Sequence, residues 1–194
     1  GGFEMGNIWY NEPKTLDVAF DVIGDIVLSA ASQQYGGFTV PEVDKILEPY
    51  AEKSYQRDID KYVRLGIDRE TAESEAYADV VREFEQGFQG WEYKFNTVAS
   101  SRGDYPFITV TAGIGTGRFA KLATISLLNV RRRGQGKKEC KKPVLFPKIV
   151  FLYDENLQGP GKPLEDVFEA GVKCSAKTMY PDWLSLTGKG YIAS

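Results

Sequence analysis

Apolar residues recur with helical spacing through the first half of the chain. Over residues 15–34 they fall at positions i, i+3, i+4 and i+7, which is the period of one buried helix face. Residues 42–65 have a similar pattern, with Pro49 as an expected kink or break. Asp68 can cap the amino end of a third and longer helix, whose apolar stripe continues to Phe95. The hydrophobic pattern therefore predicts three helices in succession.

The second half of the chain alternates between strand-like and helical patterns, so the predicted class is α/β with a helical N-terminal half. Residues 107–111 are β-branched or aromatic and predict a strand, and the apolar run 144–153 predicts another. The intervening residues 119–128 have helical spacing. A strand, a helix and a strand in this order predict a βαβ unit with parallel strands and a right-handed crossover. A last short helix is expected over residues 164–170, with Pro163 in its first turn.

The composition excludes several kinds of active site. The chain has no histidine, which rules out Ser–His and Cys–His pairs, a histidine general base and a histidine-containing zinc site. Its two cysteines, Cys140 and Cys174, cannot form a four-cysteine zinc site, and they are expected to be free thiols. No apolar run approaches the length that spans a bilayer, and the first residues show no secretion signal, so a cytoplasmic location is expected.

Basic residues are concentrated in one segment. Residues 131–142 contain seven lysines or arginines and one glutamate, within a chain whose net charge is −3. Such a segment can contact phosphate groups or nucleic acid, or it can be a solvated loop between a helix and a strand. No aromatic residue lies among the charges, which favours the solvated loop and makes a nucleic-acid partner the weaker hypothesis.

A glycine-rich segment, G-I-G-T-G at residues 113–117, lies between a predicted strand and a predicted helix. In this position backbone N–H groups and the amino end of the helix can bind a phosphate or another anion. The segment lacks the full G-x-G-x-x-G spacing and the Lys-Ser/Thr of a P-loop. A plain strand-to-helix turn is therefore the other interpretation.

Two further segments carry side chains suited to a ligand. Ser100, Ser101, Arg102 and Gly103 gather hydroxyl groups and a guanidinium just before a predicted core strand, which is typical of a polar turn or of a ligand-binding loop. Cys174 lies between glycine and proline punctuation and is flanked by two lysines. It is either a partly exposed, reactive thiol or a small buried apolar residue, and packed cysteines are the more common case.

Several long strings in the chain resemble one enzyme family. They are S-R-G-D-Y-P-F at residues 101–107, F-P-K at 146–148, Y-D-E-N-L at 153–157 and K-C-S-A-K-T-M-Y-P-D-W at 173–183. Together they closely resemble the large catalytic subunit of the anaerobic, class III ribonucleoside-triphosphate reductases, over nearly the whole chain. The resemblance implies a piece of the ten-stranded α/β barrel of the glycyl-radical and ribonucleotide reductases.

The resemblance also implies a division of the chain and a set of ligands. Residues 1–98 correspond to a helical half with a possible dimer and effector region, and residues 99–194 to a βαβ segment of the barrel. Ribonucleoside triphosphates are the implied substrates, and ATP and deoxynucleoside triphosphates are the implied effectors. The loop at residues 100–103 becomes the candidate substrate-binding site.

In this family a cysteine on a finger loop becomes a thiyl radical, which abstracts the ribose 3′ hydrogen before the 2′ hydroxyl leaves as water. That cysteine lies in a Met-Gly-Cys-Arg string, which this sequence does not contain, so Cys174 is expected to be a second, non-radical cysteine. The resemblance places the reductive cysteine, the zinc segment and the radical-bearing glycine outside this chain as well. No catalytic residue, cofactor or metal is therefore assigned within it.

Two residues depart from the family pattern: Gln158 stands where a histidine is expected, and Ala112 where a bulky residue is expected. The predicted function is an internal fragment of an anaerobic ribonucleotide reductase that is inactive alone. Its expected partners are a second copy or a complementing chain and, for the parent enzyme, a radical-SAM activase. The alternative is a non-catalytic module, derived from a reductase, that binds a nucleotide or a protein.

Overall fold

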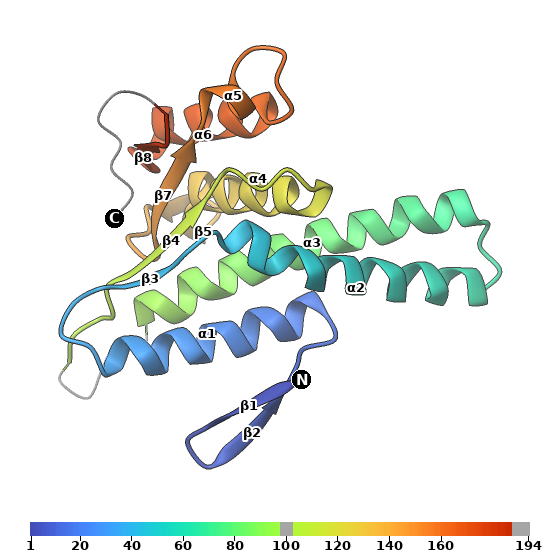
Figure 1. Cartoon of the computed structure of the whole chain (residues 1–194), viewed down its shortest axis with the longest axis horizontal. Coiled ribbons are helices and arrows are strands. Elements are labelled where there is room, and N and C mark those ends of the chain that lie inside the picture. Colours follow the sequence, from blue (N-terminus) through green and yellow to red (C-terminus); the bar gives the residue numbers. More distant parts are fainter. Residues whose placement is uncertain (98–102, 188–194) are drawn as a thin grey trace.

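The computed structural model describes residues 1–97 and 103–187. Its helices are α1 (Leu16–Ser32), α2 (Val43–Arg64), α3 (Arg69–Thr97), α4 (Arg118–Arg133), α5 (Glu155–Gln158) and α6 (Glu165–Thr178). Its strands are β1 (Gly2–Met5), β2 (Ile8–Asn11), β3 (Phe38–Val40), β4 (Ile108–Ala112), β5 (Gln135–Lys137), β6 (Cys140–Lys142), β7 (Lys148–Tyr153) and β8 (Asp182–Ser185). The class is α/β with the longest helices in the first half of the chain, as the hydrophobic pattern predicts (Figure 1). None of the described helices is long and apolar enough to cross a membrane.

Four parallel strands form the central sheet, in the order β3, β4, β7 and β8. β4 and β7 are neighbours connected through α4, and their register pairs Val110 with Ile149. The predicted parallel βαβ unit is therefore confirmed. β3 and β8 extend the sheet on its two sides, and they have only three and four residues, too few for a sequence period to mark them. β3 comes from the helical half of the chain, so the sheet joins the two halves.

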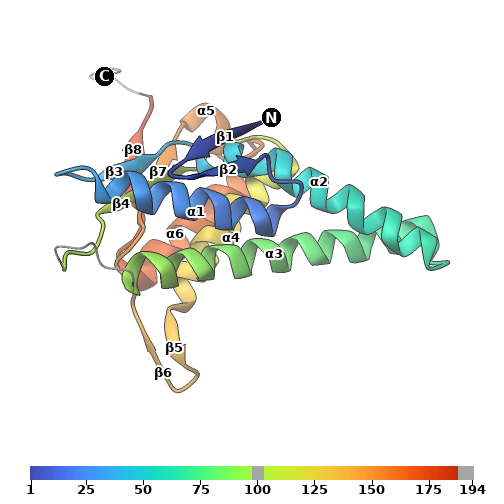
Figure 2. The ribbon, with the colours of Figure 1, turned by 90° about the horizontal axis from the view of Figure 1, so that it is seen from below.

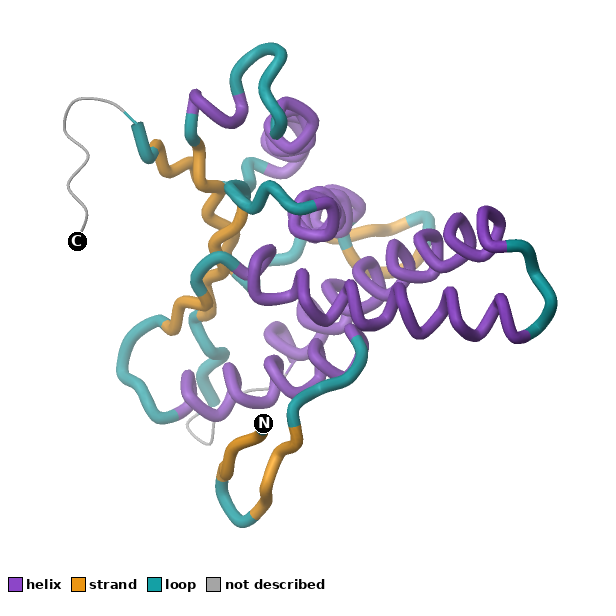
Figure 3. Tube along the Cα trace, turned by 45° about the vertical axis from the view of Figure 1, so that its right-hand side comes forward, coloured by secondary structure: helices purple, strands orange, loops and turns teal. Residues whose placement is uncertain are grey.

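Helices cover the sheet on one face (Figures 1 and 3). Alternate residues of the two central strands, such as Val110 and Phe151, belong to a core shared with α1, α2, α3, α4 and α6. The residues between them, such as Thr109 and Val150, are only partly buried. This alternation follows from the two-residue period of a strand. One face of the sheet therefore holds the core, and within the described chain the other face carries no helix.

The longest helix, α3, begins where the sequence predicts. Asp68 caps its first turn by accepting a hydrogen bond from the Thr71 N–H at 2.9 Å. Its predicted apolar stripe is buried along the whole length of the helix. α3 contacts α1, α2 and α4, so this stripe packs against three helices at once.

The contact between α1 and α3 depends on a small residue. The Phe20 ring packs edge-to-face against Phe88, and the Trp91 indole N–H donates to the carbonyl oxygen of Phe20 at 2.8 Å. Gly87 lies directly against this ring, since a Cβ added there would be 2.2 Å from a ring carbon of Phe20. Glycine at this position allows the two helices to approach each other closely.

α2 runs through Pro49 without the break that the sequence allows. A proline inside a helix offers no N–H to the carbonyl one turn earlier, which normally lowers stability. Leu47 and Ala51, on either side of it, are fully buried. The packing of α2 against α3 and α4 therefore outweighs the local cost of the proline.

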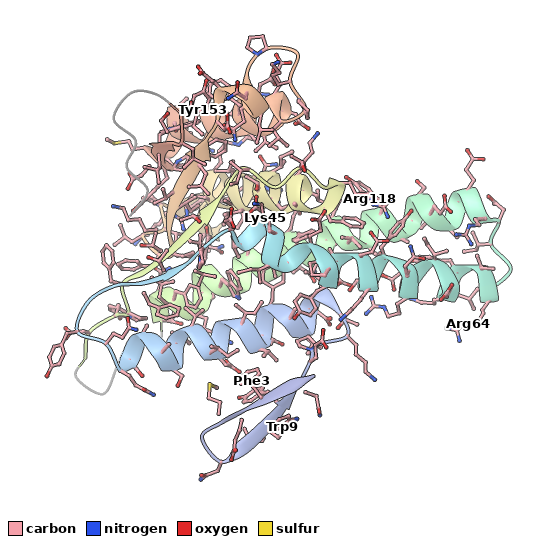
Figure 4. The ribbon with its side chains drawn as sticks, viewed as in Figure 1. Phe3, Trp9, Lys45, Arg64, Arg118 and Tyr153 are labelled. Carbon is pink, nitrogen blue, oxygen red and sulfur yellow. The ribbon has the colours of Figure 1, made fainter. Side chains whose placement is uncertain are left out.

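Two antiparallel hairpins project from the body of the molecule, and the sequence patterns predict neither. β1 and β2 pair Phe3 with Tyr10, and the two rings stack 5.4 Å apart. Phe3 lies on the side of this hairpin that faces α1, and Trp9 lies on the opposite side (Figure 4). β5 and β6 form the second hairpin, beyond the end of α4 (Figure 2). Residues 131–142, expected to be a solvated loop, are therefore the last turn of α4 followed by a hairpin.

α6 is longer than the predicted helix over residues 164–170. It continues to Thr178, and Pro163 precedes the helix instead of lying in its first turn. Gly171 reads as a boundary in the sequence but lies inside α6, against Trp183: a Cβ added at Gly171 would be 2.9 Å from that ring. Glycine at position 171 therefore leaves room for Trp183 of β8 to pack against α6, although a glycine in a sequence often marks the end of a helix.

We predict that alanine has opposite effects at two glycines of α3. Gly87→Ala should lower the free energy of unfolding by about 1–3 kcal/mol, because the new methyl group overlaps the Phe20 ring. Gly90→Ala should raise it by up to about 1 kcal/mol, because nothing lies within 4 Å and alanine favours a helix. Urea unfolding of both variants beside the unchanged chain measures the two effects. Equal effects at the two positions would show that the α1–α3 contact does not need a glycine.

Candidate functional site

The carboxyl ends of the parallel strands form the first candidate site, because open α/β sheets bind ligands at this edge. The glycine-rich segment 113–117 connects β4 to α4 there. Gly113 has a φ of +132°, which other residues rarely adopt. It also lies close to the neighbouring strand, since an added Cβ would be 2.8 Å from the carbonyl oxygen of Leu152. Glycine is thus required at the point where the chain leaves the sheet.

The backbone N–H groups of this segment bind a carboxylate of the protein itself. Asp44, near the start of α2, is fully buried. Its Oδ2 accepts hydrogen bonds from the Gly113 N–H at 3.1 Å and from the Gly115 N–H at 2.9 Å. The Thr124 hydroxyl of α4 donates to the same oxygen at 3.4 Å. The sequence allows either an anion-binding segment or a plain turn. The segment does bind an anion, but this anion is the side chain of Asp44 and not a phosphate.

Two further carboxylates of α2 extend this arrangement. Glu48 and Glu52 follow Asp44 at intervals of four residues, which places all three on one face of the helix. Glu48 lies against Gly117, where an added Cβ would be 1.7 Å from the Glu48 Oε1. Glu52 pairs at 3.1 Å with Arg118, in the first turn of α4 (Figure 4). Negative charge thus already lies at the amino end of α4, where the helix dipole stabilises it, and this charge opposes the binding of a phosphate.

Gln158 connects the carboxyl ends of β4 and β7. Its side-chain NH₂ donates to the Gly113 carbonyl at 2.6 Å and to the Leu152 carbonyl at 2.9 Å, and its Oε1 accepts from the Asp154 N–H at 3.2 Å. A neutral histidine has one donor and one acceptor, so it could not make all three bonds. Ala112, the other departure from the family pattern, is buried beside this contact. Gln158 therefore matches its surroundings in this fold.

The uncovered face of the sheet carries a row of polar side chains. Thr39 pairs with Thr109 in the register of the sheet, and Thr109 pairs with Lys148. Three neighbouring strands thus present two hydroxyl groups and an ammonium group side by side. Lys148 Nζ lies 2.8 Å from Oδ2 of Asp182 on β8. The hydrogen bond from Lys148 to this carboxylate raises the pKa of Lys148, so the ammonium keeps its proton.

A buried ion pair lies behind the amino ends of β7 and β8. The side chains of Arg131 and Glu92 are each 1% exposed, with 3.0 Å between the guanidinium Nε and the carboxylate Oε1. Arg131 also donates to the carbonyl oxygen of Pro147, and its guanidinium lies 5.0 Å from the Tyr180 ring centre. Gln135 of the β5–β6 hairpin donates to Glu92 at 2.7 Å. The interpretation of Arg131 as part of a solvated loop is therefore wrong, because it is the partner that a buried glutamate requires.

The two cysteines lie in opposite environments. Cys140 is exposed on β6, among the lysines of the hairpin. Cys174 is fully buried in α6, with its Sγ 3.5 Å from the Thr178 hydroxyl oxygen. Burial raises the pKa of the Cys174 thiol above its ordinary value. The interpretation of Cys174 as a small buried residue is confirmed, and the hypothesis of a partly exposed, reactive thiol is wrong.

The structure places only one residue of the predicted substrate-binding loop. Ser100, Ser101 and Arg102 lie outside the described residues. Gly103 is exposed, has a φ of +83° and leads toward the amino end of β4. In the sheet, this end of β4 lies beside the end of β7 that begins with Lys148. Gly103 therefore precedes the edge of the sheet opposite the glycine-rich segment.

Sequence reasoning did not identify Asp44, Glu92 or the pair of Lys148 and Asp182. Asp44 looks like an ordinary acidic residue in the first turn of a helix, and Glu92 like a polar residue of an amphipathic one. Their roles come from contacts between segments that are far apart in the chain. Lys148 alone gives a signal, because a lysine in an otherwise apolar strand must reach solvent or a partner.

Comparison with known sequences places these features in one family. The sequence model of the family described as "Anaerobic ribonucleoside-triphosphate reductase" matches residues 1–193. The chain is 37% identical over 187 residues to the anaerobic ribonucleoside-triphosphate reductase of Haemophilus influenzae, with 95% of this chain and 26% of that protein covered. It is 33% identical over 185 residues to the protein of the same name from Enterobacteria phage T4, with 95% and 30% covered. The chain thus spans less than a third of the length of these relatives.

Solved structures agree on the fold. The anaerobic ribonucleotide reductase from Thermotoga maritima in complex with dATP and CTP is similar with a TM-score of 0.61 and 17% identity, over 98% of this chain and 31% of that one. The structure of the Thermotoga maritima reductase with citrate in the active site matches with the same TM-score and 16% identity, over 93% and 32%. The predicted fold, an α/β piece of an anaerobic reductase barrel with a helical first half, is confirmed.

Removal of the Asp44 carboxylate should destabilise the chain more than removal of its neighbour. Asp44→Ala should lower the free energy of unfolding by about 2–4 kcal/mol, because two buried N–H groups lose a charged acceptor. Glu48→Ala is the matched control, one turn along the same face of α2, and should cost less than about 1 kcal/mol. Thermal and urea unfolding measure both losses. Equal losses would show that Asp44 does not hold the glycine-rich segment.

The two cysteines should react at very different rates. Iodoacetamide should alkylate Cys140 in the folded chain, whereas Cys174 should react only after unfolding, since burial excludes the reagent and raises the thiol pKa. The unfolded chain loses the Cys174 proton first, so the free energy of unfolding should fall as the pH rises past the ordinary thiol pKa of about 8.5. Mass spectrometry of the C140S variant follows Cys174 alone. Its rapid labelling in the folded variant would contradict the buried position.

Proposed function

Because the chain belongs to the anaerobic ribonucleoside-triphosphate reductase family, we propose that it forms one wall of the catalytic barrel of such an enzyme and does not catalyse the reaction alone. The observation that carries this proposal is the central sheet, which has one helix-covered face and one uncovered, polar face. Its outer strands, β3 and β8, each pair on one side only within the described residues. A barrel closes by pairing such edges, so this sheet needs further strands to be complete.

In the proposed assembly, the uncovered face lines the space in which a ribonucleoside triphosphate is reduced to a deoxyribonucleotide. The family resemblance assigns the first step to a thiyl radical that takes the ribose 3′ hydrogen. Cys174 is buried on the helix side of the sheet, and Cys140 lies on a projecting hairpin, so neither faces this space. The thiyl and glycyl radicals are therefore supplied by other parts of the complete enzyme, and this chain shapes the substrate site.

The zinc ion of the family does not fit the residues of this chain. The sequence has no histidine and only two cysteines. Across residues 1–97 and 103–187, no group of three or more Cys, Asp or Glu residues is arranged to hold a metal ion. A structural zinc site needs four ligands, most often cysteine or histidine. We therefore assign the zinc segment, like the radical-bearing glycine, to another part of the enzyme.

The proposed ligands and partners follow from the family. The Thermotoga maritima reductase in complex with dATP and CTP supports ribonucleoside triphosphates as substrates, and ATP and deoxynucleoside triphosphates as effectors. Ser100, Ser101, Arg102 and Gly103 are our proposed substrate-binding loop, because the loop leads into β4, a strand of the uncovered face. The helical half is the proposed dimer and effector region, and a radical-SAM activase is the proposed partner of the complete enzyme. We also propose a cytoplasmic location for this enzyme.

Reassembly of the activity tests this function. The chain alone should form no deoxyribonucleotide. A mixture with polypeptides that supply the remaining reductase segments, together with the activase, CTP and a reductant, should form one. A mixture that stays inactive, although every chain in it is folded, would contradict the barrel-wall proposal. If the chain alone then bound dATP, the non-catalytic nucleotide-binding module would be favoured.

The Cys174→Ala variant supplies the control for the radical assignment. Because Cys174 is buried away from the uncovered face, this variant should support the same rate of deoxyribonucleotide formation in the mixture as the unchanged chain. Circular dichroism confirms that the variant is folded. Complete loss of activity with a folded Cys174→Ala chain would place the radical chemistry on this chain and overturn the proposal.

A further inference from the structure

The ion pair of Lys148 and Asp182 lies on the uncovered face of the sheet, within a group of hydroxyl-bearing side chains. Its nitrogen and oxygen are 2.8 Å apart, and the two side chains are 37% and 50% exposed. Thr109 pairs with Lys148 in the register, and Thr111 follows on the same face of β4. We propose that this pair and the two threonines bind the ribose of a nucleoside through its hydroxyl groups. The inference rests on the proposed function and names the part of the substrate that this wall contacts.

The charges favour a sugar over a phosphate group. Lys148 is the only cationic residue in the four strands of the sheet, and Asp182 neutralises it at 2.8 Å. A phosphate placed against Lys148 would also lie close to the Asp182 carboxylate, which would repel it. A hydroxyl group is neutral and can both donate and accept a hydrogen bond. It can therefore donate to the carboxylate and accept from the ammonium at the same time.

The next row of the sheet adds a fixed hydroxyl group and an apolar contact. In register, Thr111 of β4, Val150 of β7 and Asp182 of β8 lie side by side. The Thr111 oxygen accepts a hydrogen bond from the Glu42 N–H at 2.8 Å, so its own hydrogen is available to a ligand. Val150 is only partly buried and offers apolar surface to the C–H groups of a sugar ring. This row therefore offers polar groups on both sides of an apolar one. A sugar ring likewise carries both hydroxyl groups and C–H groups.

The buried ion pair of α3 and α4 holds Lys148 and Asp182 in place from behind. Arg131 donates to the carbonyl oxygen of Pro147, the residue before Lys148. The same guanidinium packs on the ring of Tyr180, two residues before Asp182. Because Arg131 is itself fixed by a buried carboxylate, the starts of β7 and β8 are positioned before a ligand arrives. Such preorganisation lowers the entropic cost of binding.

NMR titration of the full chain tests the inference. Cytidine, which carries the ribose without a phosphate, should shift the amide signals of Thr109, Thr111 and Val150, with a Kd in the millimolar range. 2′,3′-Dideoxycytidine, which lacks both hydroxyl groups, should bind at least about fivefold more weakly, because the loss of even one hydrogen bond has about this effect. Inorganic phosphate should leave these signals unchanged.

Two variants separate ribose binding from a structural role. Asp182→Ala should weaken cytidine binding about fivefold and, because Lys148 is then unpaired, should let inorganic phosphate shift the same signals. Lys94→Gln is the matched control: Lys94 pairs with Asp25 at the same distance of 2.8 Å, but between α1 and α3, away from the sheet. This variant should bind cytidine as the unchanged chain does. A change of fold would instead alter signals throughout the spectrum of the Asp182→Ala chain.

Three results would overturn the ribose assignment. They are equal binding of cytidine and dideoxycytidine, an absence of any shift with cytidine, and shifts of the same residues by inorganic phosphate in the unchanged chain. Each is independent of the reassembly experiment. If the mixture forms deoxyribonucleotides while Asp182→Ala binds cytidine normally, the barrel-wall proposal holds and only the ribose contact is removed.

Discussion

The buried carboxylate of Asp44 connects three elements, α2, β4 and α4, at the point where β4 leads into α4. It belongs to α2, and it holds the segment through which β4 leads into α4. A buried carboxylate is very costly without partners, so its two N–H donors and the Thr124 hydroxyl are as necessary to Asp44 as Asp44 is to them. α2 is thereby fixed relative to the sheet, and α3, which packs along α2, is positioned in turn. This contact is one of several that connect the helical half to the sheet, beside the pairing of β3 with β4 and the bonds of Asn96 to Phe146.

Polar contacts hold the sheet at both ends, and apolar packing holds it between them. At the carboxyl end, Gln158 bonds the backbone of both central strands. At the amino end, Asn96 of α3 donates to the Phe146 carbonyl at 2.6 Å and accepts from its N–H at 3.2 Å, beside the ion pair of Arg131 and Glu92. Buried ion pairs contribute little net stability, because desolvation offsets the attraction. The ion pair of Arg131 and Glu92 instead positions the residues just before β7 and β8, through the contacts of Arg131 with Pro147 and Tyr180.

Helices and strands that are long enough to show a hydrophobic period could be predicted from the sequence, because the spacing of their apolar residues reveals the buried face. The helices α1, α3 and α4 are of this kind, and so are the two central strands. β3 and β8 are too short to show a period, and Gly171 reads as a boundary although it lies inside a helix to make room for Trp183. The neighbouring sequence does not show whether a glycine ends a helix or makes room for a side chain from another element.

The candidate site was less accessible to sequence reasoning than the fold. The glycine-rich segment indicates anion binding, but the anion lies 69 residues earlier in the chain, and no local pattern connects Asp44 to Gly113. Cys174 lies between Gly171 and Pro181 and has lysines nearby, a pattern typical of an exposed segment. In the structure α6 continues through Cys174 and buries its thiol. The family resemblance supplied the parent enzyme, whereas the contacts of individual side chains came only from the three-dimensional arrangement.

Within residues 1–97 and 103–187, β3 and β8 each have one unpaired edge, which bears on how the chain behaves outside the proposed barrel. An unpaired strand edge is a template for addition of another strand, from any chain that offers one. β8 presents four residues, including the exposed Trp183 and Leu184. Correct closure then competes with self-addition of identical copies, whose rate grows with their concentration. For the assembly proposed above, the concentration of identical copies therefore decides between closure of the barrel and aggregation.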